Sequence, residues 1–362
     1  MNVWKWCAFG IVVFGFPNAY AFAAEKNWFP IPVEVGGPAF KANSPKTVTD
    51  YMPLKAGMRP WDICVSFPHI KDSYWLSVNY GVVDEAKRLG VGIHLFHAGG
   101  YDNLALQIEQ IQECVQDGGK GVVIGAVSFD GLNPLIAELK DIGIPVVDLV
   151  NGMSSPFIKA KSLVSFTKMG ASAGNYIAKR HAFNNKGGKV AWFPGPKGAG
   201  WVKKGDRGFR QALSASTLKI AVTRYGETDF KTQTRLLEEV LNNNTDFDYI
   251  VGTAVTAEAA VTVLRKRGLS DKIKVVAYYF TPGVQRGIKR GTILAAPTDS
   301  AVIQGRIAID QMVRILDKKP FLAHVSPEIY IIDKSNISTF DRYTSIAPGG
   351  FWPNFIVNRV FQ

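Results

Sequence analysis

Aromatic and acidic side chains meet in the segment Asp72-Ser73-Tyr74-Trp75, which follows an apolar run at residues 62–67 and opens an amphipathic helical pattern. In parallel α/β sheets, ligands bind at the carboxyl ends of strands, where helices begin. Such turns usually hold small polar residues, whereas neighbouring aromatic rings offer faces that attract cations. The segment therefore predicts a site for a small ligand that favours ring faces, such as a methylated ammonium group or a sugar ring.

Other loops at the ends of expected strands repeat this mixture of aromatic and polar residues. One such aromatic is explained equally well by ordinary packing, but their recurrence at several strand ends favours a shared site. The candidate ligand-binding residues read from these loops are Asp72, Tyr74, Trp75, Tyr101, Tyr279 and Asp299.

Patterns typical of enzymes and metal sites are weak. The five histidines have no metal-ligand spacing on one helix face, and no G-x-S-x-G sequence is present. The run GPKGAG at Gly195–Gly200 lacks the Lys-Ser/Thr ending of a phosphate-binding loop, so it indicates a turn. We expect a protein that is not an enzyme, with no catalytic residue, no cofactor and no metal.

Strand-like and helix-like patterns alternate along most of the chain, and the alternation pauses at residues 151–168. This is the pattern of parallel sheets buried on both faces. It predicts an α/β fold with two doubly wound, Rossmann-like lobes, a hinge and a cleft between the strand ends. The expected strands lie near 62–67, 92–96, 121–124, 145–150, 189–193, 220–224, 249–252, 274–278 and 293–296.

The chain is expected to cross between the lobes near residues 150–156, 296–300 and 326–332, and the helix at 301–316 returns to the first lobe. The expected bounds are 61–153 plus 300–326 for lobe 1 and 154–299 plus 327–355 for lobe 2. Residues 25–60 are rich in Pro, Gly and Lys without a clear period, which predicts an irregular extension.

Residues 1–24 resemble a cleavable export signal, with Lys5, an apolar run at 9–16 and Ala-x-Ala sites at 19–23. A membrane anchor is the alternative, but Pro17 and Asn18 interrupt the short run. We therefore expect a periplasmic protein. The net charge of +12 is scattered along the chain, which together with export argues against nucleic-acid binding and for a solvated basic surface.

Cys64 lies in the first expected strand, and Cys114 lies in a helix that crosses over that strand. An oxidising compartment permits a disulfide between them, whereas two buried thiols are the alternative. Both interpretations stay open from the residues alone.

The architecture resembles the type I periplasmic binding proteins of the ribose-binding and LacI-like superfamily. Over residues 60–355 it is most similar to one branch, the periplasmic proteins of trimethylamine N-oxide reductase systems, which also carry cysteines at the positions of Cys64 and Cys114. The matching segments are DSYWLSVNYG (72–81), AGGY (98–101), VGTAVTAEAA (251–260), RGIKRG (286–291) and SIAPGGFWP (345–353).

This resemblance implies a sensor that binds trimethylamine N-oxide and docks on the periplasmic domain of a membrane sensor histidine kinase. It implies an aromatic cage of Tyr74, Trp75 and Tyr101 from lobe 1 with Tyr279 from lobe 2. Phe166 stands where the branch has a cage tryptophan and joins the candidate site. The alternative is a sugar-binding subunit of an ABC importer, for which the polar candidates are Asp72, Asp130, Arg207 and Asp299.

Overall fold

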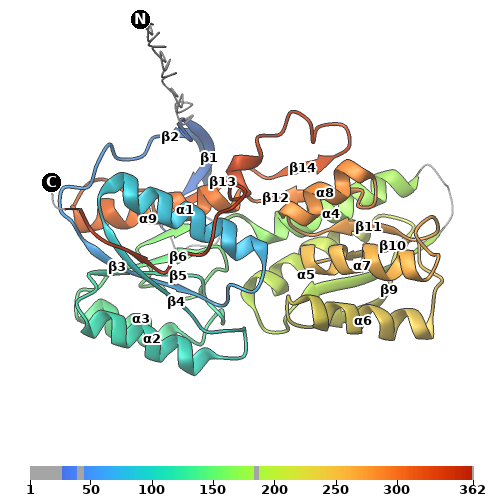
Figure 1. Cartoon of the computed structure of the whole chain (residues 1–362), viewed down its shortest axis with the longest axis horizontal. Coiled ribbons are helices and arrows are strands. Elements are labelled where there is room, and N and C mark those ends of the chain that lie inside the picture. The colour runs from blue at the N-terminus through green and yellow to red at the C-terminus, as the bar shows by residue number, and fades with distance from the viewer. Residues whose placement is uncertain (1–26, 39–44, 183–186, 361–362) are drawn as a thin grey trace, which may run out of the picture.

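The computed structural model describes residues 27–38, 45–182 and 187–360, arranged as two lobes side by side (Figure 1). The expected export signal at 1–24 lies outside these residues. Within the described ranges, no helix is long and apolar enough to cross a membrane.

The larger sheet forms the first lobe and, within the described residues, has nine strands in the order β15-β4-β3-β5-β6-β7-β13-β1-β2. Its parallel centre reads as nearly continuous apolar runs because helices bury both faces. These central strands are β3 (Asp62–Phe67), β4 (Gly92–His97), β5 (Gly121–Ile124), β6 (Val146–Leu149), β7 (Ala160–Ser162) and β13 (His324–Pro327). Helices α1 (Ser73–Leu89) and α9 (Ala301–Leu316) cover one face, and α2 (Leu104–Gln116) and α3 (Asn133–Asp141) cover the other (Figure 1).

The second lobe is built on a parallel sheet in the order β11-β10-β8-β9. Helix α4 packs against α5, and α6 packs against α7. The strands are β8 (Gly188–Gly195), β9 (Leu218–Tyr225), β10 (Tyr249–Gly252) and β11 (Lys274–Ala277), and the helices are α4 (Phe166–His181), α5 (Gly200–Leu213), α6 (Phe230–Asn243), α7 (Ala254–Lys266) and α8 (Pro282–Arg290). The expected fold class, two doubly wound α/β lobes, is confirmed.

The segments between the lobes differ in part from the sequence-based bounds. The first crossing was expected at 150–156, but β7 still pairs with β6 and β13 in the larger sheet, so the chain leaves that sheet after Ser162. Strand β12 (Ala295–Thr298) pairs with β14 (Tyr330–Asp333) in a small separate sheet. Helix α9 then returns to pack on α1, as expected.

The carboxyl-terminal tail was assigned to lobe 2 up to residue 355, but it runs back over the first lobe. The tail follows a short 3-10 turn (Arg342–Thr344). Nδ2 of Asn79 in α1 donates to the backbone oxygen of Asn354, and Oδ1 of Asn79 accepts the backbone N–H of Asn354, each at 2.9 Å. Strand β15 (Ile356–Val357) pairs with β4. These backbone bonds fix the tail to lobe 1, and the sequence pattern gave no sign of them.

The expectation of an irregular extension at 25–60 was also wrong in part. Strands β1 (Ile31–Gly36) and β2 (Lys46–Tyr51) form an antiparallel hairpin, and β1 pairs with β13. The partner strand lies almost 300 residues away in sequence, with Val33 opposite Pro327, so no local pattern signals the pairing. Val33 and Tyr51 are buried, which anchors the hairpin against α9.

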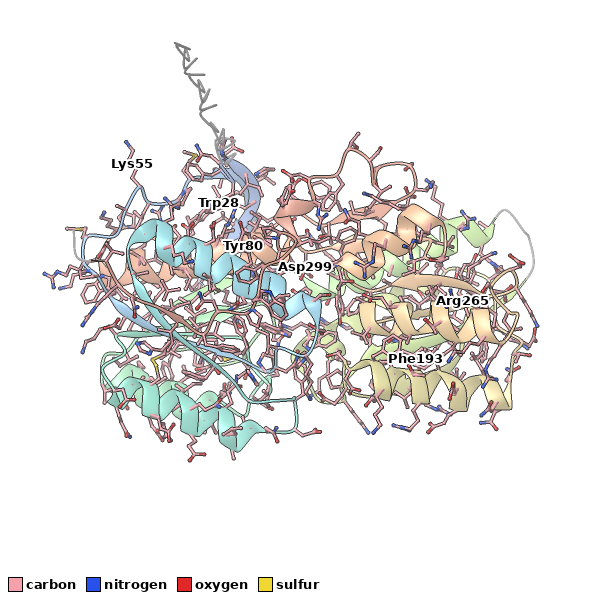
Figure 2. The ribbon with its side chains drawn as sticks, in the orientation of Figure 1. Trp28, Lys55, Tyr80, Phe193, Arg265 and Asp299 are labelled. Carbon is pink, nitrogen blue, oxygen red and sulfur yellow. A yellow bond between two sulfur atoms is a disulfide. The ribbon has the colours of Figure 1, made fainter. Side chains whose placement is uncertain are left out.

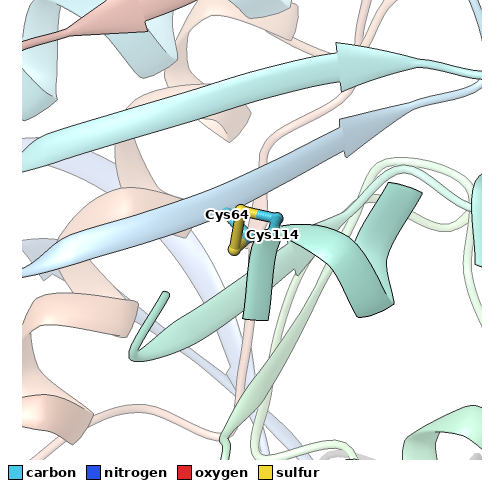
Figure 3. The surroundings of a disulfide bond; sticks show 2 residues. All are labelled: Cys64 and Cys114. Carbon is cyan, nitrogen blue, oxygen red and sulfur yellow. A yellow bond between two sulfur atoms is a disulfide. The ribbon is translucent and has the colours of Figure 1, made fainter. Parts of the chain in front are cut away.

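Cys64 of β3 and Cys114 of α2 form a disulfide, with their Cα atoms 6.1 Å apart (Figure 3). The separation lies within the range that such a bond requires. A Cβ at position 119 would collide with Sγ of Cys64, so Gly119 leaves the room that the bond occupies.

Candidate functional site

A small cavity, with about 20 Å³ of space for the centres of water-sized spheres, lies between the lobes. It is lined at strand ends and helix starts, where parallel α/β sheets bind ligands. The lining residues are Asp72, Tyr74, Trp75, Tyr101, Val150, Asn151, Phe166, Trp201, Thr228 and Tyr279. The structure thus brings the aromatic candidates and Asp72 to one cavity, whereas Asp299, Asp130 and Arg207 do not line it.

Asp72 organises one wall of the cavity as the N-cap of α1. Its Oδ1 accepts the backbone N–H groups of Tyr74 and Trp75, each at 3.1 Å, which fixes the start of the helix and both rings. Burial raises the pKa of Asp72 to about 6, because loss of solvent outweighs these two hydrogen bonds and the carboxylate of Glu258 lies nearby. The cavity thus holds a carboxylate whose charge is only partly compensated.

Aromatic rings from both lobes face one another around this carboxylate. The rings of Tyr74 and Tyr279 meet edge to face at 5.2 Å, and Trp75 stands edge to face with Tyr74 at 5.9 Å. Phe67 in β3 packs against Trp75 at 4.7 Å and backs it from the core. This ring arrangement can surround a small cation with negative ring faces.

Asp299 does not line the cavity, in contrast to its prediction as a ligand-binding residue. It lies where the lobes meet (Figure 2), and its Oδ2 accepts the Tyr74 hydroxyl at 2.5 Å and Nε2 of Gln304 at 3.0 Å. Burial raises the pKa of Asp299, and these two hydrogen bonds partly offset that rise. Asp299 therefore positions the Tyr74 ring from behind.

A hydrogen-bond chain joins the lobes beside Asp72. Nδ1 of His69 accepts the backbone N–H of Lys71 at 3.3 Å, so Nε2 carries the proton and donates to Oγ1 of Thr228 at 3.1 Å. Burial, with the charge of Lys71, lowers the pKa of His69 to about 3 and keeps the ring neutral. The Thr228 hydroxyl in turn stabilises the ionised Asp72. The contact ties the loop after β9 to the start of α1.

Four lining residues were not among the site residues predicted from the sequence. Asn151 follows β6, and its Nδ2 donates to Ala126 O at 2.7 Å and to the Tyr101 hydroxyl at 3.2 Å. Trp201 opens α5 directly after the glycine run that was assigned to a turn, so an aromatic residue at a strand end was the available signal. Thr228 had no distinctive signal. Val150 takes a φ of 65°, which is strained for a β-branched residue and has no signature in sequence.

Comparison with known proteins decides the family. Residues 63–320 match the model of the periplasmic binding protein domain. The chain belongs to the periplasmic binding proteins. It is 37% identical over 309 residues to the periplasmic protein TorT of Escherichia coli K12. The match covers 85% of this chain and 87% of TorT. Family and relative place the chain among proteins of the periplasm that generally bind ligands and do not act as enzymes.

Solved structures agree with this assignment. A solute-binding protein of an ABC transporter from Bradyrhizobium sp. BTAi1, with bound bis-tris, is 50% identical with a TM-score of 0.79 and covers 91% of this chain and 99% of its own. A chain in the complex of the TorS sensor domain with TorT, without ligand, is 34% identical with a TM-score of 0.74, and the match covers 81% of this chain and 100% of that chain. A chain in the structure of that complex in the presence of TMAO is 34% identical with a TM-score of 0.73, and the match covers 82% of this chain and 99% of that chain.

Proposed function

We propose that this periplasmic binding protein takes a small methylated amine, trimethylamine N-oxide foremost, into the cavity between its lobes and reports it to the periplasmic domain of a membrane sensor histidine kinase. The proposal includes removal of residues 1–24 on export. The single observation that carries it is the cavity in which aromatic rings of both lobes surround the Asp72 carboxylate. We assign ligand contact to Asp72, Tyr74, Trp75, Tyr101, Phe166 and Tyr279.

The cavity has the chemistry that a trimethylated nitrogen requires. Each ring face in contact with such a cation contributes about 0.5–2 kcal/mol, and the contribution is larger where water is excluded. A carboxylate with a raised pKa gains a partner when the cation enters, which favours its charged form. A cation between the rings therefore relieves the cost of burying Asp72.

A sugar is less well matched to this lining. Sugar hydroxyls require several polar side chains with free hydrogen-bonding groups, and the Nδ2 group of Asn151 is already engaged. Of the polar residues that favoured a sugar, neither Asp130 nor Arg207 lines the cavity. Asp130 pairs with Ser128, and Arg207 donates to Thr167 at 3.3 Å.

Two relatives add support from the ligands in their structures. The TorT complex was solved in the presence of TMAO, and the Bradyrhizobium protein holds bis-tris. Both compounds have a nitrogen with three carbon substituents. An amine ligand for this chain is consistent with both.

A solute-binding subunit of an ABC importer is the second candidate function. The observation that favours it is the 50% identity with the Bradyrhizobium ABC transporter protein. The two candidates share the binding step and differ in the membrane partner, so they are separated by the partner and not by the ligand.

The binding step is tested by calorimetry and thermal shift on the mature chain with trimethylamine N-oxide, glycine betaine, D-ribose and D-allose. A ligand specific for the native state raises the melting temperature by mass action. We expect a rise with trimethylamine N-oxide and none with either sugar. A rise with a sugar alone would overturn the assigned ligand class.

A further inference from the structure

The indole of Trp201 is a buried hydrogen-bond donor without an acceptor. The side chain is 4% exposed and lines the cavity, and its Nε1 has no hydrogen-bond partner in the structure. Leaving a buried donor unpaired is unfavourable, because the group gives up its hydrogen bonds with water and gains none in return. An unpaired donor in a ligand cavity points to an acceptor that arrives with the ligand.

Two other tryptophans of this chain have hydrogen-bond acceptors for their indole N–H groups. Nε1 of Trp192 donates to Asp206 at 2.7 Å, and Nε1 of Trp61 donates to Asp317 at 2.8 Å. Both of these tryptophans contact carboxylates of the fold itself. Trp201 has no such carboxylate partner and lines the cavity.

The neighbouring Tyr101 hydroxyl does not satisfy Trp201. The indole lies close enough to offset part of the rise in pKa that burial causes at that hydroxyl. The hydroxyl already accepts Nδ2 of Asn151 at 3.2 Å, and no hydrogen bond with Trp201 is completed.

Packing holds the indole in this orientation. Its ring stacks on Tyr278 with centroids 6.0 Å apart and planes 16° apart, and Phe166 lies 5.9 Å away. Gly195 has a φ of 117°, and a Cβ there would lie 2.6 Å from the Trp201 ring. The side chain therefore has little freedom to turn toward another acceptor.

We propose that Nε1 of Trp201 donates a hydrogen bond to an oxygen of the bound ligand, so that the cavity selects a small ammonium compound carrying an oxygen acceptor over one with methyl groups alone. This inference rests on the proposed function. It also accounts for Phe166 at the start of α4, because α5 supplies an indole beside that position.

The test compares two probes of similar shape, trimethylamine N-oxide and tetramethylammonium, of which only the first has an oxygen. Affinities are measured by calorimetry for the wild type, Trp201→Phe and Trp75→Phe, and a melting curve verifies the fold of each variant. Trp201→Phe keeps an aromatic face and removes the donor. Trp75→Phe is the matched comparison, because it makes the same replacement at another ring of the cavity that both probes contact.

We expect Trp201→Phe to weaken trimethylamine N-oxide about three- to tenfold more than tetramethylammonium, the effect of one hydrogen bond. Trp75→Phe is expected to leave the ratio of the two affinities within about twofold of the wild-type ratio, since both probes present the methyl groups of a positively charged nitrogen to the rings. An unchanged ratio in Trp201→Phe, with both probes still bound, overturns the role of Trp201 and leaves the proposed function intact. Failure of the wild type to bind either probe overturns both.

Discussion

At the scale of single residues, the site depends on an unfavourable burial that a ligand can relieve. Asp72 is needed as the N-cap of α1, and this position forces its carboxyl into a cavity walled by rings. Desolvation of that carboxyl outweighs the two N–H groups that it accepts. The buried charge that Asp72 offers to a ligand therefore lowers the stability of the protein when no ligand is bound.

The first prediction concerns pH. Binding of tetramethylammonium, whose charge does not titrate, should weaken about tenfold between pH 7.5 and pH 5, because Asp72 with a pKa of about 6 becomes protonated. His69, with a pKa of about 3, stays neutral over this range. Calorimetry at both pH values measures the change.

The control is Asp72→Asn, since asparagine is an equally good N-cap. Its weaker binding should be nearly independent of pH. The folded-state pKa of Asp72 is raised, so its ionisation destabilises the fold at pH values above about 6 and not below the unfolded pKa. Asp72→Asn should accordingly melt higher than the wild type at pH 7.5. Equal pH dependence in both proteins would assign the titration to another group, such as Glu258.

The second prediction concerns the ring cage. Trp75→Ala should weaken binding of a methylated amine by roughly 1–2 kcal/mol, through loss of a desolvated cation–π contact. Trp75 is almost fully buried, so a melting curve must show that the variant remains folded at the assay temperature. Unchanged affinity in a folded variant would contradict the cage.

At the scale of elements, the sequence predicts what local periodicity encodes. The largely apolar runs at 62–67 and 121–124 became β3 and β5, since a strand buried on both faces is a nearly continuous apolar run. The candidates Asp72, Tyr74 and Trp75 followed from their place after β3. The β1–β13 pairing, the tail on β4, and Trp201 at the cavity depend on contacts between distant segments, which periodicity does not record.

The third prediction concerns the disulfide, which ties β3 to α2. Cys64→Ala with Cys114→Ala should lower the free energy of unfolding by about 2–4 kcal/mol, because the bond closes a loop with a sequence separation of 50. Urea unfolding of both proteins measures the difference. A reducing agent added to the wild type should give a similar loss and none in the variant. Equal stability of both proteins would show that the bond contributes little.

At the scale of the whole molecule, the carboxyl-terminal tail forms an exposed surface on lobe 1 whose residues do not line the binding cavity. Phe351 packs against Tyr80 of α1, with ring centroids 5.1 Å apart. Trp352 is 82% exposed, and Ile356 on the edge strand β15 is also exposed. Exposed aromatic residues of this kind often anchor protein interfaces.

The fourth prediction assigns this surface to the kinase. Trp352→Ser should weaken capture of the periplasmic domain of a co-encoded sensor kinase at least about tenfold, as loss of an interface anchor does. Its affinity for trimethylamine N-oxide should stay unchanged. Val48→Ser, at the opposite edge of the sheet, is the matched control. If the wild-type protein does not bind the kinase domain but stimulates a transporter ATPase, the result would favour the function of an importer subunit.

A crystal structure of the chain grown with trimethylamine N-oxide would show whether a methylammonium group is held among the rings of both lobes. We expect ligand density in the cavity, with the nitrogen within about 6 Å of the ring centroids of Tyr74, Trp75 and Tyr279. An empty cavity at a saturating concentration, or a ligand bound elsewhere, would contradict this expectation.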